Sequence, residues 1–290
     1  MKAILFYKYV PILNPYEFQQ GQINLCNSLG LKGRLYISME GINGTLSGND
    51  KDIEEYKKRL REKKMFMDVV FKEDYVDEHV FDKLFVRIRR EVVNFGVKSL
   101  DLNKSGKKIS PREFKKILDN KEDVVVLDVR NNYESRIGKF KGALTLGIDN
   151  FRDFPKEIEK LNYLKDKKII TYCTGGIRCE KASAYMKDIG FKDVYQLEDG
   201  IIGYNQEYPD SYFEGKCFVF DKRIAVQINT GEYEKILSNC IFCNESCDRY
   251  VNCFDTECNE LFICCEKCQI ENNGFCDKHK VISILNTILC

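Results

Sequence analysis

The sequence predicts a multidomain protein of mixed α/β and α+β class in three parts: a small α+β domain, an α/β domain with a parallel sheet, and a cysteine-rich C-terminal domain. In residues 1–97, strand-like runs alternate with two helical segments. Residues 117–215 contain continuous apolar runs, which are typical of strands that are covered on both faces. Ten of the 14 cysteines lie between Cys240 and Cys290, so residues 216–290 differ in composition from the rest.

The order of the segments in residues 1–97 predicts the first domain. Glu40–Gly44 contains two glycines between strand-like runs and predicts the turn of a hairpin. The order βαββαβ predicts a ferredoxin-like split sandwich. The expected elements are a strand at Ala3–Tyr9, a helix from Pro15, strands at Gly33–Ser38 and Gly44–Leu46, a helix over Asp52–Lys64 capped by Asn49 or Asp50, and strands near Met67–Phe71 and Leu84–Val93.

Residues 98–116 are predicted to be a basic linker that leads into a helix starting near Pro111. Ser105 and Gly106 lie inside this segment. Only Asp101 and Glu113 oppose its positive charges. Its basic residues are Lys98, Lys104, Lys107, Lys108, Arg112, Lys115 and Lys116.

Residues 117–215 alternate buried strands and helices, which predicts an α/β domain. Val124–Leu127 and Lys168–Tyr172 are apolar enough for the centre of a parallel sheet, and Val194–Leu197 is a third strand. Glu180–Ile189 has its apolar residues on one helical face.

Composition limits the class of protein. The chain has 290 residues, 46 Lys+Arg and 45 Asp+Glu, so a nucleic-acid surface would have to come from local clustering of charge. No run approaches the roughly 18 apolar residues of a membrane span, and residues 1–8 do not resemble a signal peptide. We therefore expect a cytoplasmic protein without a membrane partner, in which clustered cysteines favour metal binding over disulfides.

The segment from Cys173 to Arg178 is the strongest candidate for a catalytic site. It lies between a buried strand and a helix and contains Gly175 and Gly176. Backbone N–H groups, the N-terminus of the helix and the guanidinium can all stabilise a Cys173 thiolate there. Such a thiolate is an activated nucleophile that can carry a persulfide. Cys179 is either an ordinary buried thiol or a second redox-active thiol able to attack an oxidised Cys173.

The cysteines of the tail have the spacing of metal ligands. Two C-x-x-C pairs about twenty residues apart are typical of tetrahedral zinc bound by thiolates, and metal would supply folding free energy to this polar segment. An iron–sulfur cluster and plain reduced or disulfide-paired cysteines are the alternatives to zinc. The first expected site is Cys240, Cys243, Cys265 and Cys268, and a second draws on Cys253, Cys258, Cys276 and His279.

Motifs along almost the whole chain resemble one family. The loop has four residues between Cys173 and Arg178, as in rhodanese-type sulfurtransferase loops, whereas tyrosine-phosphatase loops have five. Together the motifs resemble those of the rhodanese-domain tRNA uridine hydroxylases. Asp199 departs from the pattern, in which glycine is common. The matching segments are Glu40–Gly48, Arg90–Val93, Leu127–Arg130, Tyr133-Glu134, Gly138–Ala143, Cys173–Glu180, Cys217–Asp221, Cys240-x2-Cys243, Arg249–Cys253 and Cys265-x2-Cys268.

The resemblance implies an acylphosphatase-like N-terminal domain (residues 1–97), a rhodanese domain (117–215) and a cysteine-rich domain (216–290). It implies oxygen-dependent conversion of the wobble uridine at tRNA position 34 to 5-hydroxyuridine, with Cys173 in the active site and O2 as co-substrate. The residues themselves offer no usual oxygen-activating group. His79 and His279 are the only histidines, which disfavours a non-haem iron site, and no G-x-G-x-x-G motif indicates a flavin or NAD.

The expected nucleic-acid partner is tRNA and not DNA. Arg87 and Arg89 alternate with apolar residues, so both are expected to project from one face of a strand, although a solvated strand face is the simpler interpretation. The Glu40–Gly44 segment is either a plain turn or a substrate-contacting loop. The candidate tRNA-binding residues are Arg87, Arg89, Arg90, Lys107 and Lys108.

Two other functions remain open from the sequence. A rhodanese-type sulfurtransferase or persulfide carrier would use the same loop around Cys173. A non-catalytic module that binds tRNA or protein would use the basic linker and the metal-like tail.

Overall fold

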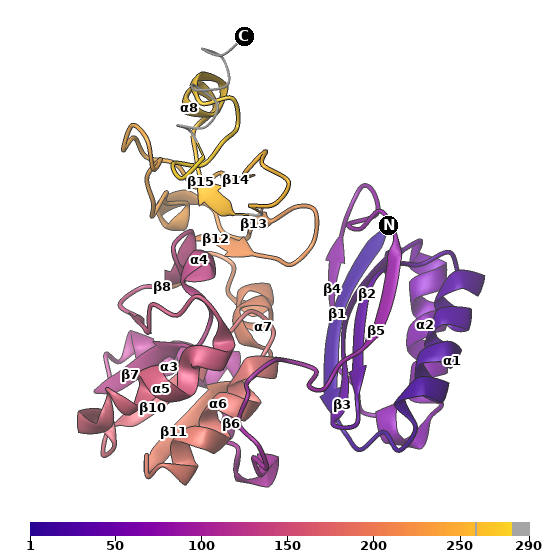
Figure 1. Cartoon of the computed structure of the whole chain (residues 1–290). Helices are drawn as coiled ribbons and strands as arrows, with labels where there is room; N and C mark the ends of the chain where they lie inside the picture. Colours follow the sequence, from indigo (N-terminus) through magenta and orange to yellow (C-terminus); the bar gives the residue numbers. More distant parts are fainter. Residues whose placement is uncertain (259, 280–290) are drawn as a thin grey trace.

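The computed structural model describes residues 1–258 and 260–279, which form three parts (Figure 1). Cys290 lies outside these residues. The first part is a five-stranded sheet of order β4-β1-β3-β2-β5 with two helices on one face (Figure 1). The strands β4-β1-β3-β2 pair antiparallel, as in a split βαβ sandwich, and β5 is added at the edge as a parallel neighbour of β2. Its elements are β1 (Lys2–Tyr9), α1 (Pro15–Ser28), β2 (Lys32–Ser38), β3 (Gly41–Gly48), α2 (Asp50–Arg61), β4 (Phe71–Tyr75) and β5 (Leu84–Ile88).

Three details of this domain differ from the sequence-based prediction. The hairpin turn is Met39-Glu40, and Gly41–Gly44 belongs to β3. Those glycines serve close strand packing, because a Cβ on Gly41 would lie 2.0 Å from the Lys8 carbonyl oxygen. Residues 67–70 precede the strand β4, and β5 ends at Ile88, so Arg89 and Arg90 follow the strand.

The second part is a five-stranded parallel sheet of order β6-β11-β10-β7-β9 with helices on both faces. The prediction of an α/β domain is confirmed. Residues 98–116 are not a free linker, because β6 pairs with β11 and the helix from Pro111 packs on the same domain. The elements are β6 (Lys107–Ile109), α3 (Pro111–Asp119), β7 (Val124–Asp128), α4 (Asn132–Ser135), β9 (Leu144–Thr145), α5 (Phe154–Glu159), β10 (Lys168–Tyr172), α6 (Ile177–Asp188), β11 (Asp193–Leu197) and α7 (Gly200–Glu207).

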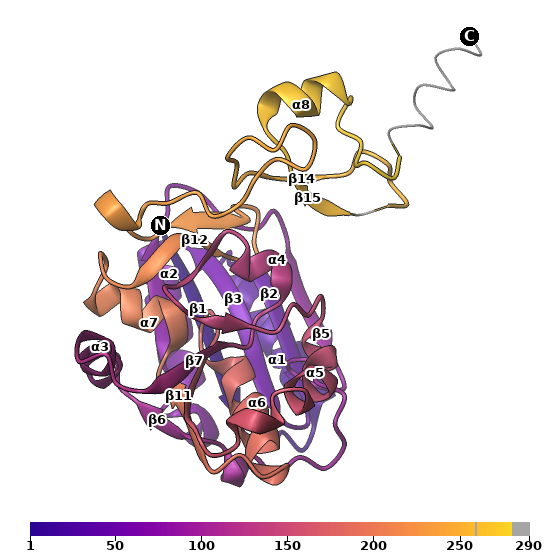
Figure 2. The ribbon, with the colours of Figure 1, turned by 90° about the vertical axis from the view of Figure 1, so that its left-hand side faces the viewer.

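The C-terminal part packs on the end of the second domain near α4 (Figures 1 and 2). The Tyr250 hydroxyl donates to the Tyr133 carbonyl of the second domain at 2.5 Å, and within the C-terminal part Lys216 pairs with Asp248 at 2.9 Å. Its strands β12 (Phe213–Phe218) and β13 (Ala225–Gln227) form one small sheet with β8 (Gly138–Phe140) of the second domain. Its other elements are β14 (Tyr250–Asn252) and β15 (Leu261–Ile263), which form a second small sheet, and α8 (Glu266–Glu271). Short 3-10 turns lie at Lys64–Phe66, Leu102–Lys104, Phe151–Asp153, Asn162–Leu164 and Gly231–Tyr233.

The face of the first sheet that carries no helix is turned toward the second domain (Figure 1). Ion pairs join the two domains: Lys72 meets Asp199 at 2.7 Å, and Lys181 meets Glu40 and Glu91 at 2.9 Å each. These contacts place the helix-free face of the sheet opposite the loop after β10. Among the described residues, no helix is both long and apolar enough to span a bilayer.

Candidate active site

Cys173 lies at the carboxyl end of β10, where the chain turns into α6. Its side chain is fully buried, and its Sγ accepts a hydrogen bond from the Gly176 N–H at 3.1 Å. Gly176 has φ +98°, a left-handed conformation that aims its N–H into the loop. The loop thus curls its backbone amide toward the sulfur, as an activated thiolate requires.

Backbone hydrogen bonds from the start of α7 fix the loop that contains Cys173. The Ile201 N–H donates to the Cys173 carbonyl at 3.0 Å, and the Ile202 N–H donates to the Thr174 carbonyl at 3.1 Å. Gly200 has φ +62°, and a Cβ there would lie 2.3 Å from the Cys173 carbonyl oxygen. Only glycine fits at this position without displacing the loop.

Arg178 is buried against Glu134, which follows β7 on the short helix α4. The two side chains form a bidentate ion pair, with Arg178 Nη2 at 2.7 Å from Glu134 Oε2. Both side chains are almost completely shielded from solvent. The carboxylate therefore fixes the guanidinium beside Cys173.

The surroundings of Cys173 favour its thiolate. Burial alone would raise the pKa of this thiol. A hydrogen bond from the Cys179 thiol, the charge of Arg178 and the N–H groups of Arg178 and Gly176 outweigh burial and lower the pKa to about 5. Burial and the neighbouring Cys173 thiolate raise the pKa of Cys179. At neutral pH the pair therefore holds one proton, on Cys179.

Alkylation of Cys173 by iodoacetamide is expected to reach half of its maximal rate near pH 5, because the pKa of the thiol lies there. The pKa is lower in the folded than in the unfolded chain. The thiolate therefore contributes stability that is complete above the ordinary thiol pKa and is lost as the pH falls toward 5. Peptide mass spectrometry of the alkylated full chain measures the profile. Arg178→Gln should shift the midpoint upward, and a midpoint near the ordinary thiol value in the unsubstituted chain would contradict this account of the loop.

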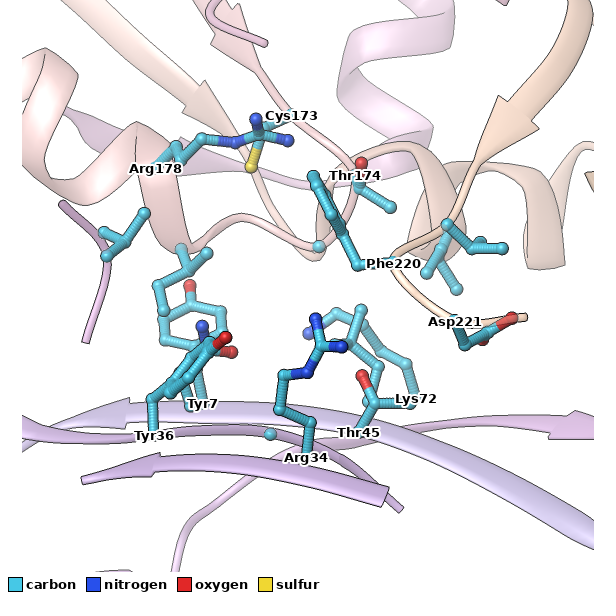
Figure 3. Close-up of a pocket in the computed structure, with 18 of the residues that line it drawn as sticks. Tyr7, Arg34, Tyr36, Thr45, Lys72, Cys173, Thr174, Arg178, Phe220 and Asp221 are labelled. Carbon is cyan, nitrogen blue, oxygen red and sulfur yellow. The ribbon is translucent and has the colours of Figure 1, made fainter. Parts of the chain in front are cut away.

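A cleft of about 1010 Å³ lies between the two domains, with Cys173 in its lining (Figure 3). The helix-free face of the first sheet forms one wall, and the loop after β10 forms the opposite wall. The two walls touch closely, because a Cβ on Gly175 would lie 2.8 Å from Leu5 Cδ2. The Tyr7 hydroxyl, on the first sheet, donates to Glu180 Oε1 of α6 at 3.3 Å, which is a further contact between the two domains.

Asp199 takes part in the same contact between the domains. It adopts φ +57°, a left-handed conformation that aspartate tolerates better than most residues. Its carboxylate meets the buried Lys72 at 2.7 Å. The residue that departs from the family pattern thus ties the start of α7 to the first sheet.

The tail contains two groups of potential metal ligands, away from the cleft. The ligand atoms of each group all lie within 4.8 Å of one another. The structure therefore brings together both sets expected from the spacing. The first group is Cys240, Cys243, Cys265 and Cys268. The second group is Cys253, Cys258, Cys276 and His279.

Comparison with known proteins gives matches along most of the chain. Residues 1–92 match the UPF0176 acylphosphatase-like domain, residues 110–207 the rhodanese-like domain, and residues 214–280 the region described as rhodanase C-terminal. A protein of Cytophaga hutchinsonii named tRNA uridine(34) hydroxylase is 44% identical over 96% of this chain and 88% of its own length. A protein of Bacillus licheniformis with the same name is 43% identical over 92% of this chain and 84% of its own length.

The chain belongs to the tRNA uridine(34) hydroxylase family. The resemblance seen in the sequence is thereby confirmed. Among solved structures, the rhodanese-like domain of an Anabaena sp protein is 22% identical, covers 37% of this chain and 78% of its own length, and has a TM-score of 0.32.

In this member of the hydroxylase family, the cleft contains two of the five residues expected to contact tRNA. Arg89 and Arg90 line it, and Arg89 lies over the Tyr36 ring, 5.6 Å from its centroid. Arg87 is not among the lining residues, and its guanidinium lies over Phe85 instead.

The two lysines expected to contact tRNA lie on β6, at the edge of the second sheet. Lys108 reaches Glu180 at 3.1 Å, and Lys107 is exposed on the same strand. Neither lines the cleft. Lys107 and Lys108 lie away from Arg89 and Arg90 because β6 is part of the sheet of the second domain, whereas the two arginines follow the last strand of the first domain.

Several cleft residues were not proposed from the sequence. The cleft residue Phe220, and Glu134, which lies outside the lining and pairs with Arg178, stand in the matching motifs, but no local signal shows that they approach the loop of Cys173. Arg34, Lys72 and Arg152 come from three separate segments that only the tertiary fold brings together. An alternation of charged and apolar residues in β2 was the one available signal for Arg34.

Proposed function

We propose that this protein converts uridine 34 of tRNA to 5-hydroxyuridine with O2 as co-substrate and Cys173 as its reactive group. The observation that carries the proposal is a thiol whose pKa is lowered to about 5, placed in the lining of a cleft large enough for a nucleotide. The relatives described above bear the name of this activity. The reaction replaces the C5 hydrogen of uracil with a hydroxyl group.

Arg178 and Cys179 support Cys173 in this proposal. Arg178 keeps the sulfur in its thiolate form through its charge and its N–H group. In this proposal, one oxygen atom of O2 enters C5 of uracil and the other oxidises the Cys173 thiolate to a sulfenic acid. Cys179, whose thiol donates a hydrogen bond to the Cys173 sulfur, then attacks the sulfenic acid, which forms a disulfide and releases water. Cellular thiols then reduce the disulfide by exchange.

A sulfurtransferase or persulfide carrier is the second candidate, because the loop after β10 has rhodanese length and a sulfur-directed Gly176 N–H. Nucleoside mass spectrometry of tRNA from a strain that lacks this gene separates the two functions. The hydroxylase requires loss of 5-hydroxyuridine. Rapid thiosulfate:cyanide turnover with unchanged nucleosides would instead favour the sulfurtransferase.

The proposed partner is tRNA, and the proposed compartment is the cytoplasm. Arg89 and Arg90 are the candidate phosphate contacts, because both are exposed and line the cleft that contains Cys173. Arg87, Lys107 and Lys108 are the proposed contacts of the tRNA body outside the cleft.

We further propose that the two groups in the tail each hold one zinc ion. Four cysteines, or three cysteines and one histidine, are the usual donors of structural tetrahedral zinc, and both groups have their ligand atoms within 4.8 Å of one another. The metal would supply folding free energy to a region whose described residues form only short strands and one short helix.

Elemental analysis of the purified full chain is expected to give two zinc ions per chain. Cys265→Ser should remove about one of them and make the tail sensitive to proteolysis, because it takes a ligand from the first group. Cys247→Ala is the matched control, since Cys247 is buried nearby but belongs to neither group. Iron with acid-labile sulfide in place of zinc, or equal zinc content in Cys265→Ser, would contradict the assignment.

A further inference from the structure

Phe220 presents an exposed aromatic ring inside the cleft. The ring is 49% exposed, although it follows the buried strand β12. The guanidinium carbon of Arg178 lies 5.8 Å from its centroid, so the ring is close to the loop that holds Cys173 (Figure 3). The Phe218 ring supports it in an edge-to-face contact at 5.3 Å.

The segment that carries Phe220 is fixed at both sides. The Val219 N–H donates to the Ile224 carbonyl at 2.8 Å, which closes a tight loop. Arg223 pairs with Asp221 at 2.6 Å and with Asp74 of the first domain at 2.7 Å. The exposed ring is therefore held in place, and binding against it requires little ordering of the protein.

The cleft carries an excess of unpaired positive charge. Its carboxylates all have cationic partners: Glu73, Asp74, Glu91 and Asp221 pair with lysine or arginine. Its other cations, Lys72, Arg178 and Arg223, are paired as well. Within the described ranges, four lining arginines have no carboxylate partner: Arg34, Arg89, Arg90 and Arg152.

Two of these guanidiniums are oriented by aromatic rings of the first domain. Arg34 lies over Phe81, 5.5 Å from the centroid, and Arg89 lies over Tyr36 at 5.6 Å. In Figure 3, Arg34 rises from the first sheet toward the side of the cleft that carries Phe220 and Cys173. The cleft thus combines an aromatic surface beside the thiol with cations on the facing wall, which is the combination that binds single-stranded nucleic acid.

We propose that the cleft receives one unstacked pyrimidine nucleotide from a single-stranded RNA loop, with its base stacked on Phe220 beside Cys173 and its flanking phosphates on the four unpaired arginines. This inference rests on the proposed function and specifies how its substrate is bound. A buried thiol is out of reach of a base inside a helix, so the nucleotide must leave the stack. The ring replaces part of the stacking energy that is lost. Phe220 is a positioning residue.

The probe is a synthetic RNA hairpin that copies an anticodon stem-loop with uridine at position 34, and its affinity for the full-length protein is measured. Phe220→Leu is expected to weaken binding about 5- to 150-fold, the equivalent of one lost base stack, whereas Phe220→Tyr should restore it. On a hairpin with an abasic site at position 34, the leucine variant should bind as well as the unsubstituted protein. A purely structural role of Phe220 would weaken binding of both hairpins equally.

The arginines are tested by the salt dependence of the same binding reaction. Each of Arg34→Gln and Arg89→Gln should reduce the slope of log affinity against log salt by about 0.7, because each removes one phosphate contact to a single strand. Arg112→Gln is the control, since Arg112 is exposed on α3 outside the cleft.

Equal affinity of Phe220→Leu and Phe220→Tyr for the intact hairpin, or unchanged salt slopes in both arginine variants, would overturn this inference. Hydroxylation of tRNA is followed in parallel to keep the two proposals apart. If the unsubstituted protein forms no 5-hydroxyuridine, the proposed function fails. If it does, and Phe220→Leu forms it at the same rate, only the nucleotide-binding inference fails.

Discussion

Cys173→Ala is expected to lower the rate of 5-hydroxyuridine formation in tRNA about a thousandfold or more, because it removes the reactive thiolate. The measurement is nucleoside mass spectrometry of tRNA from cells in which the variant replaces the natural protein. Alanine should fit without strain, since it is smaller than the buried cysteine and the loop is held by its backbone bonds to α7.

Cys26→Ala is the matched control, because Cys26 is equally buried but lies in the core of the first domain. The control variant should retain hydroxylation. Retention of 5-hydroxyuridine in Cys173→Ala, in cells without another route to this nucleoside, would show that the thiol is dispensable.

Glu134→Ala is expected to destabilise the second domain by about 3–5 kcal/mol, because it leaves the buried Arg178 guanidinium without its partner. Urea unfolding of the full chain, followed by a probe in the second domain, measures the loss. Glu134→Gln keeps the shape of the side chain and should recover part of the stability.

Glu157→Ala is the surface comparison for this prediction. Glu157 pairs with Lys160, which is largely exposed, so its loss should cost less than about 1 kcal/mol. Similar destabilisation in Glu134→Ala and Glu157→Ala would contradict the role assigned to the buried pair.

Local patterns were sufficient to predict most of the fold. The apolar run Lys168–Tyr172 is β10 as expected, and Val124–Leu127 forms all but the last residue of β7. Local patterns did not predict the strand β6 (Lys107–Ile109), because this short basic segment has no alternation of polar and apolar residues. The segment is a strand because it pairs with β11. Local patterns also failed at Gly41–Gly44, where glycines typical of a turn instead allow close contact between strands.

The candidate site was predictable only where it is continuous in the sequence. Cys173, Arg178 and Cys179 lie in one loop and the following turn of helix, so their spacing sufficed. The partner of Arg178 could not be read from that loop, because Glu134 reaches it from a different strand–helix junction. That Arg34 has no carboxylate partner can be recognised only from the tertiary structure, which shows where the neighbouring carboxylates lie.

The cysteine-rich tail was more predictable than the cleft. The C-x-x-C pairs specify the first group directly, and the second group, including His279, was expected as well, although its spacing is less regular. Ligand spacing is informative because a small metal site forces nearby residues together. The residues that line a cleft between domains can lie at any spacing in the sequence, so their spacing does not reveal them.

The most direct test of the central claim is nucleoside mass spectrometry of tRNA from cells that lack this gene and carry it on a plasmid, grown under isotopically heavy O2. The account predicts no 5-hydroxyuridine at position 34 without the plasmid, and a heavy oxygen atom in that nucleoside when the plasmid is present. Unchanged 5-hydroxyuridine in the cells without the gene, or a light oxygen atom in cells with it, would contradict the claim that this protein hydroxylates tRNA with O2.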